Sequence, residues 1–63
     1  MESLDDLANE IAELESRVSD AIFTTLREQL SGDDDAKELE RRLSKVRRSL
    51  QKAEMLLRGV GTD

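Results

Sequence analysis

The segment at residues 36–60 reads AKELERRLSKVRRSLQKAEMLLRGV. Its apolar residues recur at alternating steps of three and four, from Ala36 to Val60. This spacing places them in one line along an α-helix, on the a and d positions of a seven-residue repeat. Because water would otherwise touch this line, the segment predicts a helix that packs against another helix.

A second helix with a similar pattern is expected before this segment. Ser3 and Asp6 have the spacing of a capping box, which predicts that the helix begins near Leu4. Gly32 can adopt the left-handed conformation that ends a helix. We expect helix one at about 4–31, a turn at 32–35, helix two at about 36–58 and a short frayed tail at 59–63.

The start of helix two carries three consecutive aspartates, at 33–35. They place negative charge at the positive end of the helix, and Asp35 with Glu38 repeats the capping-box spacing. Two helices of about 25 residues joined by so short a connection must fold back on each other. The predicted fold is therefore all-α, a single antiparallel two-helix hairpin of coiled-coil type.

The chain is small, with 63 residues, no Cys and no His. Domains of this size bury little surface and usually need a disulfide, a metal or association for stability. We therefore expect a homodimer in which two hairpins form a four-helix bundle. The residues expected in the helix–helix interface are Leu7, Ile11, Leu14, Val18, Ile22, Leu26, Leu39, Leu43, Val46, Leu50 and Leu57. Those expected to make contacts between chains, because they lie beside the main line, are Phe23, Met55 and Leu56.

The charges are separated along the chain. Residues 1–31 carry eight acidic side chains against two arginines, whereas residues 36–58 carry eight basic side chains against three glutamates. The two halves should attract each other in an antiparallel hairpin. Exposed ion pairs contribute only about 0–1 kcal/mol each, so we expect these charges to select orientation and partner.

The composition argues against several classes of function. Without His, Cys, Tyr or Trp, we expect no catalytic residues and no enzymatic activity. The aspartates at 33–35 lack the ligand spacing of a calcium loop, so we expect no metal. We also expect no membrane span and a cytoplasmic location, since the chain has no long apolar run and no signal-like start. A net charge of −5 and the lack of interleaved aromatic residues argue against nucleic-acid binding.

One polar pattern on helix two is a candidate nucleotide-binding set. Its members recur at steps of four, three and four, which places them in one stripe beside the apolar line; they are Glu40, Ser44, Arg47 and Gln51. Arginine binds phosphate or a guanine edge, and glutamate accepts hydrogen bonds from guanine amino groups. The serine hydroxyl and the glutamine amide can form hydrogen bonds with either the phosphate or the guanine base.

This stripe resembles the signature of the RsiG family of anti-sigma factors, Glu-x3-Ser-x2-Arg-x3-Gln-x3-Asp. The first four positions match, and the local context agrees at Arg48, Leu50, Leu57 and Arg58. The fifth position holds Met55 instead of aspartate, with Glu54 one position earlier. The resemblance covers residues 40–58. It implies a helical hairpin that binds cyclic di-GMP as a regulatory ligand and, so loaded, holds a sigma factor, with two hairpins bringing two stripes together around the ligand.

Three hypotheses for function follow. The first is a non-enzymatic helical-hairpin module that self-associates and docks on a larger protein as a regulator or adaptor. The second is a cyclic di-GMP-dependent anti-sigma factor of the RsiG type. The third is a small subunit that completes an enzyme complex without supplying catalytic groups.

Overall fold

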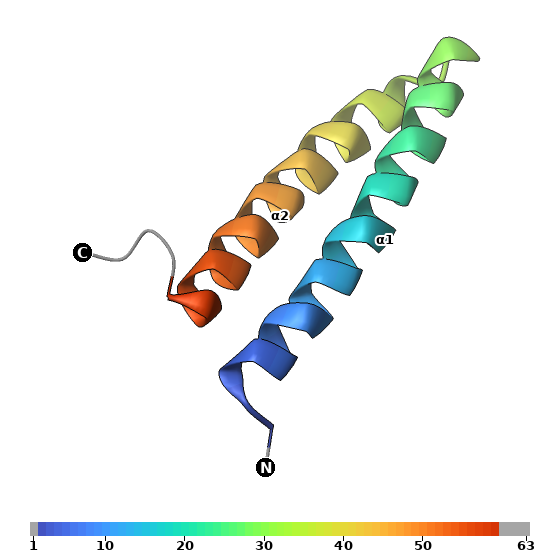
Figure 1. Ribbon diagram of the computed structural model, residues 1–63. Coiled ribbons are helices and arrows are strands. Elements are labelled where there is room, and N and C mark those ends of the chain that lie inside the picture. The colour runs from blue at the N-terminus through green and yellow to red at the C-terminus, as the bar shows by residue number, and fades with distance from the viewer. Residues whose placement is uncertain (1, 60–63) are drawn as a thin grey trace.

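The structure, a computed structural model that describes residues 2–59, contains two helices, α1 (Leu4–Leu30) and α2 (Asp34–Arg58). Figure 1 shows α1 and α2 side by side and running in opposite directions, joined by a short turn at one end. The start of α1 and the end of α2 lie together at the other end. The all-helical hairpin expected from the sequence is thus confirmed.

The start of α1 is stabilised by the expected capping box. The Ser3 hydroxyl oxygen accepts a hydrogen bond from the Asp6 backbone amide at 3.1 Å, and the Asp6 carboxylate accepts one from the Ser3 amide at 3.2 Å. Two backbone donors that the first helical turn cannot pair internally are satisfied in this way. The helix therefore begins at Leu4.

The turn between the helices depends on Gly32, whose φ of 91° is in the left-handed region. The Gly32 amide donates to the Gln29 carbonyl at 2.9 Å, and the Asp33 amide donates to the Glu28 carbonyl at 3.3 Å. These bonds pair carbonyl groups that the end of α1 would otherwise leave open. Helix α1 ends at Leu30, one residue before the expected boundary.

Helix α2 begins two residues earlier than expected. Its N-cap is Asp33, whose carboxylate accepts a hydrogen bond from the Asp35 amide at 3.0 Å. Asp33 is the first residue after Gly32 that can cap the helix, so Asp35 becomes helical instead of capping it. At the other end Gly59, with φ of 77°, forms the C-cap. The rest of the expected tail, 60–63, lies outside the described residues.

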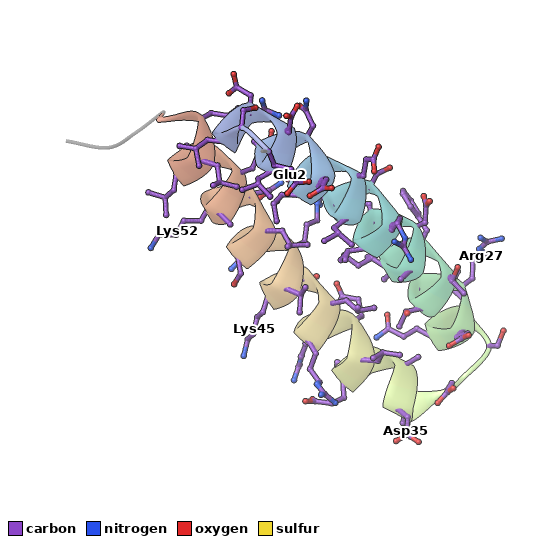
Figure 2. All side chains as sticks on the ribbon, turned by 90° about the horizontal axis from the view of Figure 1, so that it is seen from below. Glu2, Arg27, Asp35, Lys45 and Lys52 are labelled. Carbon is purple, nitrogen blue, oxygen red and sulfur yellow. The ribbon has the colours of Figure 1, made fainter. Side chains whose placement is uncertain are left out.

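The core is thin. Among the described residues only three side chains are buried, namely Ala8, Thr25 and Ala36, and no large side chain is fully enclosed. A pair of helices covers each helix on one side only, so most side chains extend into solvent. Figure 2 shows this arrangement: Lys45 and Lys52 extend from α2 away from α1, and Arg27 extends from the outer side of α1.

Candidate functional site

The line along which the helices meet, here called the seam, follows a seven-residue repeat on each helix. Its central positions are all buried or half-buried; they are Ala8, Glu15, Ile22 and Gln29 on α1, and Ala36, Leu43, Leu50 and Leu57 on α2. Ala8 has no exposed surface and Ala36 is 2% exposed. Both alanines lie near the start of their helices, and therefore at opposite ends of the hairpin, and the facing helix covers their side chains.

Residues beside the central positions point to one broad side of the hairpin or to the other. A residue directly after a central position lies on one side of the seam, and a residue directly before it lies on the opposite side. Asn9 and Arg58 both follow a central position, and the Arg58 guanidinium donates a hydrogen bond to the Asn9 side-chain oxygen at 3.0 Å. Corresponding positions of the two helices therefore lie on the same side of the hairpin.

This rule defines two faces of different character. The polar face consists of Asn9, Ala12 and Ser19 of α1 and Glu40, Ser44, Arg47, Gln51, Glu54 and Arg58 of α2. Near the turn, Phe23, Leu26 and Leu30 of α1 also lie on this side and are 66%, 40% and 89% exposed, so this end of the side is apolar. The apolar face consists of Leu4, Leu7, Ile11, Leu14, Val18 and Ala21 of α1 and Leu39, Val46, Ala53 and Leu56 of α2. The apolar face runs along almost the whole hairpin; Leu7, Ile11, Val18, Ala21 and Ala53 are half-buried at the seam, and the other five members are exposed.

The residues expected in the interface divide between the seam and its edges. Seven of them are half-buried: Leu7, Ile11, Val18, Ile22, Leu43, Leu50 and Leu57. Four are 40–46% exposed: Leu14, Leu26, Leu39 and Val46. Of the four central residues of α1, the apolar pattern marked only Ile22; it did not mark Ala8, Glu15 or Gln29. No sequence pattern marks an alanine and a glutamate as seam positions, so the sequence could not locate the seam of α1.

The three residues expected to contact another chain are all exposed, but they do not lie together. Leu56 is part of the apolar face and is 54% exposed. Phe23 directly follows the central residue Ile22, so it lies on the side of the polar face. Met55, 48% exposed, points outward from α2. Only Leu56 therefore belongs to the large apolar surface.

A buried threonine completes the seam near the turn. Thr25 is 3% exposed, and its hydroxyl donates a hydrogen bond to the Ala21 carbonyl at 2.8 Å. This bond satisfies the hydroxyl inside its own helix, so the side chain can be buried without a partner on α2. The sequence pattern did not indicate this position.

The four residues of the candidate nucleotide-binding stripe all lie on the polar face. Glu40 and Ser44 are half-buried, and the Ser44 hydroxyl donates a hydrogen bond to Glu40 Oε1 at 2.9 Å. Arg47 and Gln51 are exposed. The stripe therefore presents one guanidinium and one amide to solvent, while its acid and its hydroxyl bond to each other.

A pair of carboxyl groups bridges the seam on the same face. Glu15 Oε2 is screened from solvent and has no hydrogen-bond partner among the described residues. The neighbouring carboxyl group of Glu54 raises the pKa of Glu15, as does burial. Arg47 and Arg58 act in the opposite direction. The pKa of Glu54 is lowered, first by the neighbouring Glu15 side chain and then by Arg58, whose Nε lies 2.9 Å from Glu54 Oε2. A proton is thus held by Glu15 more readily than by Glu54.

The separated charges of the two halves form few direct links. Within residues 2–59, the ion pair between Arg58 and Glu54 joins two residues of α2. The link that crosses between the helices is the hydrogen bond from Arg58 to the neutral Asn9. Within these residues no ion pair joins the two helices, so the attraction expected between the halves stays a prediction.

Other kinds of site are not found in the part of the chain that the structure describes. This part holds no cluster of acidic side chains suited to a metal ion and encloses no pocket. Neither helix is long and apolar enough to cross a lipid bilayer.

Comparison with models of known protein families, with curated proteins and with solved structures found no match to this chain. The resemblance to the RsiG signature consequently remains a prediction. The arguments that follow depend on the two faces of the hairpin.

Proposed function

We propose that the protein is a non-enzymatic helical-hairpin interaction module that acts in the cytoplasm. In this proposal it dimerises into a four-helix bundle and docks on a larger protein as a regulator or adaptor. The observation that carries the proposal is the apolar face, where large side chains stay exposed along both helices. Leu4, Leu14 and Leu39 are 62%, 40% and 44% exposed, and Val46 and Leu56 are 46% and 54% exposed.

The free energy available from covering this face supports association. Full burial of a leucine or valine side chain contributes about 1.5–3 kcal/mol relative to full exposure. Since these side chains are about half exposed, each would gain roughly 1 kcal/mol on contact with a partner. The buried core of the single hairpin is small, so this gain is large relative to what the monomer already has.

A pair of substitutions at matched exposure tests the proposal. Val46→Asp places a charge on the apolar face, and Met55→Asp places the same charge on the outer side of α2. We expect the native protein and Met55→Asp to sediment as dimers, and Val46→Asp to sediment as a monomer that is still helical by circular dichroism. A native protein that is monomeric at tens of micromolar, or equal disruption by both variants, would contradict the proposed use of this face.

The second hypothesis, cyclic di-GMP binding, is supported by one feature of the polar face. The four residues of the stripe share that face, and Arg47 is exposed beside them. If a nucleotide binds there, calorimetry with cyclic di-GMP should give heat for the native protein and none for Arg47→Ala. Arg42→Ala, which removes an exposed arginine of α2 outside the polar face, should give the same binding heat as the native protein. No heat with the native protein would eliminate this hypothesis.

Docking on a larger protein is tested separately. Affinity capture from the native host with and without added cyclic di-GMP distinguishes the two hypotheses, because only the RsiG-like one predicts a partner whose capture requires the ligand. Capture of a sigma factor only in the presence of cyclic di-GMP would favour the second hypothesis over the first.

A further inference from the structure

A second exposed apolar cluster lies beside the turn, on the side of the polar face. It consists of Phe23, Leu26 and Leu30 of α1, here called the turn patch, which are 66%, 40% and 89% exposed. Phe23 and Leu30 directly follow the central residues Ile22 and Gln29, and Leu26 lies between them on the same side. In Figure 1 this segment is the green end of α1, at the opposite end of the hairpin from the start of α1 and the end of α2.

The turn patch exists because the apolar stripe of α1 crosses the seam. Up to Val18 the stripe follows the side of the apolar face, it lies in the seam at Ile22, and from Phe23 it continues on the opposite side. From Val18 to Leu30 the stripe advances in steps of four residues, which carry it around the helix instead of along it. The two exposed parts of the stripe therefore face in opposite directions, and one partner surface cannot cover both.

Neither a second copy on the apolar face nor the tail can cover the turn patch. The two surfaces lie on opposite sides of the seam, so the dimer proposed above leaves the turn patch on its outer side. Residues 60–63 follow Arg58, which bonds to Asn9, and Asn9 lies about 30 Å along α1 from Leu30. Four residues span at most about 14 Å. The turn patch is therefore free to bind another molecule.

The size and shape of the turn patch fit a contact with a larger protein. A fully exposed phenylalanine or leucine presents about 200 Å² of surface, so the three side chains expose roughly 400 Å². Each partner in a stable interface of standard size buries about 800 Å², so two turn patches in contact with each other would bury too little. A second convex hairpin touches only the tips of these side chains, whereas a groove also encloses their sides. The area thus favours a concave partner over a second copy at this place.

The spacing of the three side chains is that of a helix bound in a groove. Phe23, Leu26 and Leu30 occupy positions i, i+3 and i+7, the anchors that an amphipathic helix inserts into an apolar groove. They extend over about 10 Å of the helix. Phe23 is the only aromatic residue of the chain, and aromatic side chains are enriched in protein interfaces.

The charges around the turn patch do not select a partner of one sign. From residue 20 to residue 44, this side of the hairpin and its outer edge carry four acidic and three basic side chains. They are Asp20, Asp33, Asp34 and Glu40, and Arg27, Lys37 and Arg41. An apolar centre with a polar rim is typical of protein interfaces. The mixed rim and the net charge of −5 disfavour an anionic membrane or a nucleic acid at this surface.

We propose that the turn patch is the surface by which the hairpin docks on a larger protein, with Phe23, Leu26 and Leu30 inserted as helical anchors into an apolar groove of that protein. This inference rests on the docking proposed above and adds its place on the molecule. In a dimer formed through the apolar face, the two turn patches lie on the outer sides of the bundle. The dimer therefore presents two docking helices.

Crosslinking from within the turn patch tests this assignment. The photoreactive residue p-benzoylphenylalanine replaces Phe23, where it keeps an aromatic ring, and the full chain is expressed in the native host and irradiated. Met55, which is 48% exposed on the outer side of α2, receives the same group as a matched control. We expect position 23 to give an adduct with one larger protein that position 55 does not give, and Leu30→Asp in the same chain to remove it. An adduct with a second copy only, or the same adducts from both positions, overturns the proposal.

Binding of the purified partner provides the affinity. The protein identified in the adduct is titrated with the full chain by calorimetry. Phe23→Ala should weaken binding about tenfold or more, as expected for a central aromatic anchor, and Met55→Ala should leave the affinity unchanged. Both side chains are exposed, so both variants should keep the circular dichroism spectrum of the native protein. Equal affinity of the native protein and Phe23→Ala overturns the proposal.

The outcomes separate this inference from the proposed function. An adduct with a larger protein from p-benzoylphenylalanine at Leu56 of the apolar face, and none from position 23, overturns the place of docking and leaves docking itself intact. No adduct with another protein from either position overturns docking as well. Phe23→Ala should sediment like the native protein. A monomeric Phe23→Ala beside a dimeric native protein would show that Phe23 lies between copies, which overturns this inference and leaves self-association intact.

Discussion

Ala8 provides the most direct test of where the two helices meet. Its side chain has no exposed surface, and its neighbour Asn9 bonds to Arg58 at the end of α2. Replacing Ala8 by leucine adds three carbon atoms where the helices leave no room. The apolar pattern of α1, which marks Leu7 and Ile11, predicts instead that a larger residue at position 8 would be harmless.

The expected cost follows from the burial. Inserting extra methylene groups into a packed site costs about 1–3 kcal/mol. A chain of this length has a free energy of unfolding of about 3–9 kcal/mol, so Ala8→Leu should remove a substantial part of it. For a domain of this size, 1 kcal/mol corresponds to about 4–8 °C, and a cost of about 2 kcal/mol lowers Tm by about 8–16 °C.

The assay is thermal unfolding followed by far-ultraviolet circular dichroism. All variants are compared at one protein concentration, because the proposed dimerisation would make Tm depend on concentration. Ser16→Leu is the control, since Ser16 is an exposed small residue of the same helix. An Ala8→Leu protein that melts at or above the native Tm would refute the close approach of the helices at this end.

Three further predictions concern stability. Glu15→Gln should raise Tm at neutral pH. The pKa of Glu15 is raised in the folded protein, so ionisation of Glu15 opposes folding. The native protein should therefore lose stability as the pH rises through that pKa. Melting curves from about pH 4 to about pH 8 should show this loss in the native protein and not in the variant. Gly32→Ala should lower the free energy of unfolding by about 1 kcal/mol, because the backbone φ of 91° is unfavourable for a residue with a Cβ. No described atom beyond the adjoining residues lies within 4 Å of the added Cβ, so the cost comes from the backbone alone. An unchanged denaturant midpoint would contradict this prediction. Ser3→Ala removes the acceptor of the Asp6 amide and should cost about 1 kcal/mol, seen as faster amide exchange confined to the first turn of α1; uniform acceleration along the helix would argue against a local cap.

Local features of the fold could be predicted well. The capping box at Ser3 and the left-handed glycine at 32 depend on neighbouring residues only, and the structure shows both. The start of α2 was predicted two residues too late, because each of the three consecutive aspartates can cap a helix. Asp33 does so since it is the first to follow the turn.

The candidate site was harder to predict. The stripe from Glu40 to Gln51 could be placed on one side of α2 from its spacing, but the hydrogen bond between Glu40 and Ser44 depends on side-chain conformation. The carboxyl pair of Glu15 and Glu54 joins residues 39 positions apart, and an apolar pattern gives no reason to place a glutamate in the seam. It was therefore missed.

The sequence by itself determined that this protein is two helices folded back on each other, because helical periodicity, caps and turn residues act over a few neighbouring positions. Only the tertiary structure decided which side of each helix meets the other. The apolar stripe of α1 is wide enough to allow several rotations about the helix axis, and close packing selects the one that brings Ala8 to the seam and leaves Leu14 at its edge. That rotation separates an apolar face from a polar one, and the proposed association depends on this separation.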